Sequence, residues 1–177
     1  MIYFFIYLIN FSLSEPSSNY KILDSLCKSQ SIEISKFLLK NSKTEFELSI
    51  KSPYNPIILK SNLIRTFDSL NLMNIQGGDS LNLELLNYGV KYNSTEVSDK
   101  IKRTINVKSF FENKYFSNIY FDTILRTDLL LIEDSNYSEL KAIPPDPNKN
   151  FVDYILEPIV LIGSGIITLL LLFTIRS

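Results

Sequence analysis

The chain contains no histidine, no tryptophan and a single cysteine, Cys27. A lone cysteine excludes a disulfide within the chain, and without histidine the usual zinc sites built from His and Cys ligands are excluded as well. The Ser-His-Asp and Cys-His catalytic arrangements are excluded for the same reason. We therefore expect no catalytic residue, no cofactor and no bound metal, and we interpret Cys27 as a buried thiol on an apolar helix face.

An excess of positive charge is also missing. The 177 residues carry 18 Lys and Arg against 19 Asp and Glu, a net charge of −1, and the two signs are interspersed along the chain. A nucleic-acid surface is typically a cluster or stripe of basic side chains, so we expect no nucleic-acid partner.

Long hydrophobic runs are present at both ends. Residues 159–175 contain no charged side chain, and as a helix this run would cover ~26 Å, close to the hydrocarbon thickness of a bilayer. We predict a single transmembrane helix over residues 151–175, with the bilayer as its partner and a cytoplasmic tail at 176–177.

Small residues within this predicted helix indicate a site of close helix packing; the alternative is a lipid-facing anchor that merely tolerates them. They are Gly163, Ser164, Gly165 and Thr168.

The apolar start of the chain is too short to span a membrane and resembles a signal peptide. Ser12 and Ser14 place small residues at a cleavage site, which predicts a signal peptide at residues 1–14. The alternative is a buried strand or an uncleaved anchor. With both ends assigned, we expect a single-pass protein of the cytoplasmic membrane whose N-terminal domain is exported, to a periplasmic or extracellular space.

About 130 residues remain between the two ends, the size of one ordinary domain. We assign the exported domain to residues 15–143 and a proline-rich linker to residues 144–150, where Pro144, Pro145 and Pro147 favour an extended spacer. Helical periodicity begins after Ser17 and Ser18 and again after Asn55. Between them, residues 44–51 alternate apolar and polar side chains as a half-buried strand does.

The pattern of the second half of the domain predicts β-strands. Residues 81–92 alternate with a slip of phase near Leu85, which indicates a β-bulge. Residues 100–111 and 115–125 alternate as well, and apolar side chains on both faces of the latter predict a strand that is central or covered on both sides. The fold class is therefore α+β: a small antiparallel or mixed sheet of three to five strands with two helices on one face.

The order helix, strand, helix, then strands resembles that of small periplasmic accessory domains, such as the N-terminal domain of TolB and lipoprotein activators of cell-wall synthases. The resemblance lies in the order of the elements alone.

The strand from residue 100 carries several basic side chains, a pattern typical of a guarded sheet edge. We predict that this strand, or the solvated face of the sheet, binds another protein. The candidate residues are Lys100, Lys102, Arg103 and Lys108.

Two classes of function follow. The first is a membrane-anchored, non-enzymatic interaction or accessory domain of the cell envelope, acting in the assembly or scaffolding of a complex. The second is a small envelope enzyme that uses carboxylate or lone serine chemistry, but Glu45 and Glu47 share a strand face with no third group to perturb them. A further alternative is a eukaryotic single-pass glycoprotein, because the triplets at Asn93 and Asn136 match glycosylation acceptors.

Overall fold

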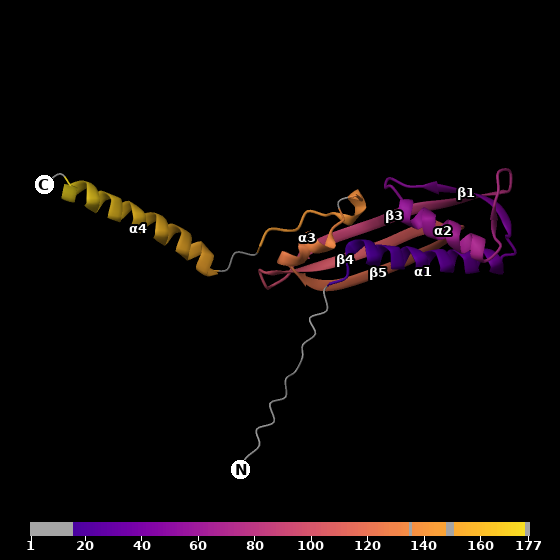
Figure 1. The fold of residues 1–177 in the computed structure, drawn as a ribbon, viewed down its shortest axis with the longest axis horizontal. Coiled ribbons are helices and arrows are strands. Elements are labelled where there is room, and N and C mark those ends of the chain that lie inside the picture. The colour runs from indigo at the N-terminus through magenta and orange to yellow at the C-terminus, as the bar shows by residue number, and fades with distance from the viewer. Residues whose placement is uncertain (1–15, 135, 148–150, 176–177) are drawn as a thin grey trace, which may run out of the picture.

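The computed structural model describes residues 16–134, 136–147 and 151–175 (Figure 1). The predicted signal peptide lies outside the described residues, as do residues 148–150 of the linker and the tail. The elements, in chain order, are α1 (Asn19–Lys40), β1 (Glu45–Lys51), α2 (Ile57–Ser69), β2 (Met73–Asn74), β3 (Asp79–Ser94), β4 (Lys100–Phe111), β5 (Lys114–Leu125), the 3₁₀ turn η1 (Arg126–Asp128), α3 (Leu129–Ile132), the 3₁₀ turn η2 (Ser138–Leu140) and α4 (Phe151–Ile175).

The strands form one mixed sheet in the order β2-β1-β3-β4-β5. β1 runs parallel to both of its neighbours, whereas β3, β4 and β5 form an antiparallel meander. The parallel pair of β1 and β3 is possible because α2 carries the chain back between them. The α+β class and the mixed sheet are confirmed. The sheet is larger than predicted, since β3 alone has 16 residues.

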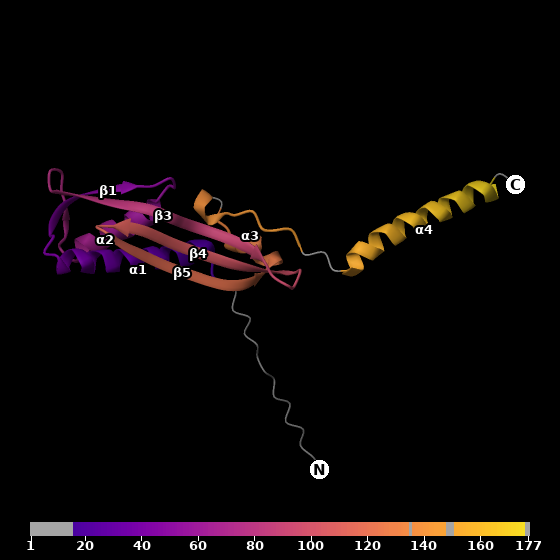
Figure 2. The ribbon, with the colours of Figure 1, turned by 180° about the vertical axis from the view of Figure 1, so that it is seen from behind.

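Helices α1 and α2 lie side by side on one face of the sheet (Figure 1), and seen from behind the strands stand in front of them (Figure 2). Ser18 starts α1 as expected: its hydroxyl oxygen accepts a hydrogen bond from the backbone N–H of Lys21. The core forms where the apolar stripe of each helix meets the inward side chains of the strands. Its fully buried members include Leu23, Ile34, Phe46, Leu59, Leu63, Leu83, Ile105 and Phe111.

Helix α1 continues without a break through the polar residues 28–31. Gln30 and Ser31 are buried there, and the Ser31 hydroxyl donates to the carbonyl of Cys27 at 2.8 Å. The Gln30 side-chain amide donates to the hydroxyl of Ser109 on β4. These bonds satisfy the Ser31 hydroxyl and the Gln30 amide nitrogen, whereas the Gln30 Oε1 has no hydrogen-bond partner among the described residues.

Two predictions about strand position are wrong. The strand with the basic residues, β4, is not an edge, because β3 pairs with one side of it and β5 with the other. β5, predicted to be central, is the edge strand, and side chains such as Phe121 on one of its faces are exposed. The bulge is confirmed: the register of β3 against β4 shifts between Leu85 and Asn87.

A helix, α4, forms over the whole of the predicted transmembrane stretch and lies apart from the sheet in both views (Figures 1 and 2). Within the described parts of the chain, no helix has the combined length and hydropathy that crossing a membrane requires. The prediction of a transmembrane helix is not supported by this finding.

Candidate interaction surface

The face of the sheet opposite α1 and α2 carries large apolar side chains that nothing in the described chain covers. Tyr115 is 63% exposed, Ile119 60% and Phe121 68%, and all three come from alternate positions of β5. Beside them on β4, Lys102 and Lys108 project from the same face. We call these five residues the aromatic–lysine surface.

The lysines of this surface lie over its aromatic rings. The Lys102 Nζ is 5.5 Å from the ring centroid of Phe121, and the Lys108 Nζ is 5.4 Å from that of Tyr115. Such cation–π contacts hold the ammonium groups near the sheet while leaving them partly in water. Neither lysine forms an ion pair with a described residue, so both charges remain available to a ligand.

Basic side chains gather on the part of the open face that β4 and the end of β3 form. Lys91 on β3 and Lys100 on β4 are exposed there, beside Lys102 and Lys108. Toward β1 the face carries both signs, because Glu84 on β3 and Glu45, Glu47 and Lys51 on β1 are exposed. The positive and aromatic part of the face therefore fits an acidic partner that also offers apolar groups.

Three of the four predicted binding residues lie on this open face, and the fourth does not. Lys100, Lys102 and Lys108 are exposed, whereas Arg103 points to the opposite, covered face and is fully buried, with 0% exposure. Arg103 occupies the apolar phase of the strand, although the prediction grouped it with the three exposed lysines. That phase was the correct signal: the side chain belongs to the interior.

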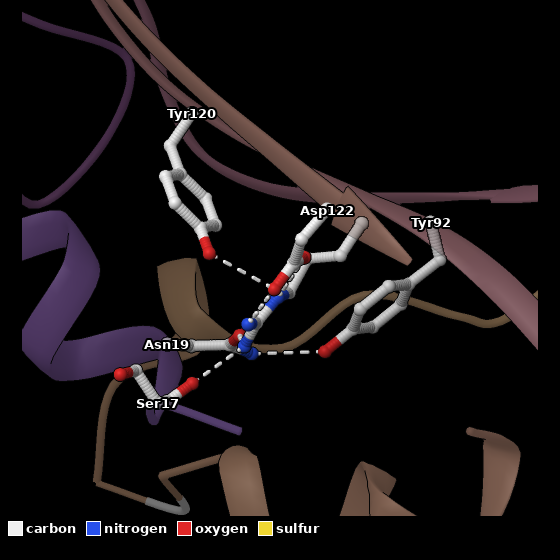
Figure 3. A network of polar contacts seen from close by, with 6 residues as sticks. Ser17, Asn19, Tyr92, Tyr120 and Asp122 are labelled. Atoms are coloured by element: carbon white, nitrogen blue, oxygen red, sulfur yellow. Dashed lines mark hydrogen bonds and ion pairs between the residues drawn. The ribbon is translucent and has the colours of Figure 1, made fainter. Parts of the chain in front are cut away.

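Three residues hold the buried guanidinium of Arg103: Asp122 on one side, and Ser17 and Asn19 on the other (Figure 3). Its Nε donates to Oδ1 of Asp122 at 2.9 Å, and its Nη2 donates to Oδ2 of the same carboxylate. Asp122 stands directly opposite on β5 in the strand register. On the other side, Nη1 donates to the carbonyl oxygen of Ser17 at 2.8 Å and to Oδ1 of Asn19 at 3.0 Å.

Further bonds extend the network to distant parts of the chain (Figure 3). The Asn19 amide donates to the hydroxyl of Tyr92 on β3 at 2.9 Å and to the carbonyl of Leu140 in η2 at 2.8 Å. The Tyr120 hydroxyl donates to Asp122 at 3.1 Å. The start of α1, three strands and the C-terminal part of the domain are thus joined at one buried point.

The network around Arg103 stabilises the fold. Burial alone would lower the pKa of Arg103, but hydrogen bonding to Asp122 and the charge of that carboxylate more than offset burial, and the pKa is raised above its ordinary value. Arg103 therefore remains charged, as a paired buried cation must. The side chain of Arg103 has no exposed surface, and that of Asp122 retains 24%.

Cys27 is buried, as predicted. Burial, assisted by the charge of Asp24, raises the pKa of the thiol from its ordinary value of 9.0 to about 12, against a smaller lowering by hydrogen bonding to Tyr88. The thiol is therefore protonated at neutral pH and unreactive. In the part of the chain that the structure describes, no group of His, Cys, Asp and Glu side chains is placed to hold a metal ion.

The small residues of α4 have no packing partner among the described residues. A Cβ added to Gly163 or Gly165 would meet no atom within 4 Å. The hydroxyls of Ser164 and Thr168 donate within the helix, to the carbonyls of Leu161 and Ser164. Close helix packing at this patch stays a prediction.

A groove lies between β1 and α2, with a volume of about 340 Å³. Apolar side chains dominate its wall, and Lys60 is the single charged residue among those that line it. The lining residues include Leu48, Ile50, Ile57, Leu63, Ile64 and Phe67. The groove contains no pair of carboxylates and no serine, so the groups that the enzyme alternative requires are not gathered there.

The fold and this open face define the molecule as an α+β domain with one covered and one uncovered sheet face. The chain matches no protein-family model, and the comparison with curated proteins found no match. Among solved structures, it is similar to a minor lipoprotein from Acinetobacter baumannii at 11% identity and a TM-score of 0.35, over 48% of this chain and 67% of the lipoprotein. A similarity this low supports no conclusion about function.

Proposed function

We propose that this protein is a non-enzymatic accessory or scaffolding protein of the cell envelope, and that its exported domain binds another envelope protein through the aromatic–lysine surface. The observation that carries the proposal is the set of three heavily exposed apolar side chains on β5, flanked by two lysines without ion-pair partners. Exposed apolar clusters with a polar rim are typical of interaction sites.

The chemistry of the chain favours binding over catalysis. The absence of histidine removes the commonest general acid and base. The cysteine is buried and protonated, and Glu45 and Glu47 stand on a solvated face. What remains is a surface on hydrogen-bonded strands, whose backbone is already ordered before a partner docks on it.

Attachment to the cytoplasmic membrane through residues 151–175 forms part of the same proposal. Its support comes from the sequence, in which residues 159–175 lack any charge, and from the helical conformation of that stretch. Attachment would hold the domain at the membrane and raise its local concentration near partners there. We expect the full chain to sediment with membranes after washing with carbonate, and a chain that ends at residue 150 to be released; release of both would contradict the attachment.

The surface itself is tested by charge reversal. In a pull-down from solubilised envelopes, we expect the Lys102→Glu/Lys108→Glu variant to lose at least tenfold of the partner captured by the wild-type chain. Reversal replaces two attractive contacts with repulsive ones and removes the cation–π contacts. The stability of the domain should change little, because both side chains are exposed.

The matched control is Lys36→Glu/Lys60→Glu, which changes the net charge by the same amount at two lysines exposed on α1 and α2. It should leave capture unchanged. Equal capture by all three proteins would refute the assignment of this surface, and an equal loss in both variants would point to net charge rather than to a docked face.

A further inference from the structure

The outer edge of β5 is long and unpaired. In the described part of the chain, β5 pairs with β4 over twelve residues on one side and with no strand on the other. The opposite edge of the sheet is treated differently. There β2 has only two residues, and the side chain of the second, Asn74, accepts a hydrogen bond from the N–H of Leu48 on β1 at 2.9 Å.

The hairpin between β4 and β5 determines which backbone groups face outward. Its two loop residues, Glu112 and Asn113, both have positive φ, 48° and 62°, as a type I′ turn requires. Such a turn is closed by a hydrogen-bonded pair, here Phe111 with Lys114. Because hydrogen-bonded and non-bonded pairs alternate along an antiparallel ladder, the N–H and C=O groups of the odd-numbered residues of β5 point away from β4.

The outward N–H and C=O groups of β5 lack the usual protection of an edge strand. Natural edge strands are commonly protected by lysine, proline or a bulge. The odd-numbered residues of β5 carry no charge and no proline, and the pairing with β4 is regular throughout. They are Tyr115, Ser117, Ile119, Phe121, Thr123 and Leu125.

We propose that β5 pairs antiparallel with β5 of a second copy of this chain, about a two-fold axis at Asn118. Outward groups meet only when odd residues face odd residues, and the register centred on Asn118 satisfies this condition. It also sets Lys114 opposite Asp122 of the second copy, twice by symmetry, and Tyr115 opposite Phe121. Opposite charges and aromatic pairs facing each other across strands stabilise a sheet.

Both charged groups can take these roles. Lys114 forms no ion pair with a described residue and lies 5.0 Å above the ring of Phe116. Asp122 accepts three hydrogen bonds, from Arg103 and Tyr120, and is partly exposed. A carboxylate has about four acceptor positions, which leaves one for the lysine.

A two-fold axis normal to the sheet keeps the helices of both copies on the same side. The two open faces become continuous, and each Tyr115 joins the Phe121 of the other copy. The pairing uses the edge of the sheet, whereas the proposed partner uses its open face, so the two proposals can fail independently.

The test measures the mass of the full chain in detergent by sedimentation equilibrium at micromolar concentration. We expect a dimer for the wild-type chain and a monomer for Ser117→Pro, which deletes an outward donor without removing a bond to β4. Ser117→Ala is the matched control and should remain dimeric. Lys114→Glu should raise the dissociation constant about tenfold, whereas Lys100→Glu, on β4, should not.

Ile119→Lys gives a second route to a monomer should Ser117→Pro fail to fold, which a thermal melt reports. A wild-type monomer would overturn the proposal, including the case in which β5 binds an extended segment of another protein. A dimer that survives both edge variants but is lost in Ser164→Leu would assign association to α4 and overturn it as well. Lys102→Glu/Lys108→Glu should keep the dimer while losing the envelope partner.

Discussion

Arg103→Ala is expected to lower the free energy of unfolding of the domain by about 3 kcal/mol, because it leaves the buried Asn19 and the partly exposed Asp122 without their shared donor. The network joins the start of α1 to β3, β4, β5 and η2. Its loss should therefore weaken the packing of all five elements at this end of the sheet. For a domain of this size the melting temperature should fall by roughly 10 °C. Urea titration followed by circular dichroism measures the change.

Lys102→Ala is the control, since Lys102 neighbours Arg103 on the same strand but projects to the open face. Its unfolding free energy should lie within about 0.5 kcal/mol of the wild-type value. Arg103→Leu separates the loss of charge from the loss of volume and should also be destabilising. A stability for Arg103→Ala equal to that of Lys102→Ala would show that the network does not hold the domain together.

Gly89→Ala should destabilise the domain by about 2–4 kcal/mol through strain and steric overlap. Gly89 has a φ of 127°, in the region that favours glycine, and an added Cβ would lie 2.7 Å from the carbonyl oxygen of Glu139. The backbone of η2 would have to move, although Leu140 of the same turn is fully buried and bonded to Asn19. Thermal melts of both proteins measure the change.

Gly77→Ala is the matched control. Gly77 also has a positive φ, 84°, but a Cβ there would meet no atom within 4 Å. Only backbone strain remains, and the expected loss is about 1 kcal/mol. Equal losses at the two positions would mean that η2 does not pack closely on β3.

Local patterns in the sequence predicted much of the domain, because they depend on neighbouring residues. The Ser18 cap, the strand containing Phe46 and the bulge beside Leu85 all follow from spacing and residue type. The covering of one face by two helices follows from their apolar stripes. The two-residue strand β2 has too few residues for a periodic signal.

The order of strands in the sheet could not be obtained in the same way. Whether β4 or β5 forms the edge depends on pairings between residues far apart in the chain. The apolar side chains on both faces of β5 suggested a central strand, whereas the open face of β4 is mostly polar. Basic residues on β4 suggested an edge, although three of them lie on an open face and Arg103 is buried against Asp122. An arginine in the apolar phase of one strand, with an aspartate in the apolar phase of the next, is the signal that would have indicated a buried pair.

The aromatic–lysine surface was only partly predicted. The lysines were identified, but the apolar half of the site comes from β5, which the sequence placed inside the sheet. With β5 interior, Phe121 and Ile119 would have been covered. The exposure of these side chains therefore depends on the strand order, which only the structure supplies.

Site-specific photo-cross-linking in the cells that make the protein tests the central claim most directly. A photoreactive phenylalanine at Thr104 would lie on the open face beside Phe121, its register partner, without altering either lysine. One at Ile64, exposed on α2, serves as the control. The proposed function predicts a defined cross-linked species, heavier than the 20.4 kDa chain and different from its dimer, from Thr104 but not from Ile64. No cross-link to another protein from Thr104, or the same products from both positions, would contradict it.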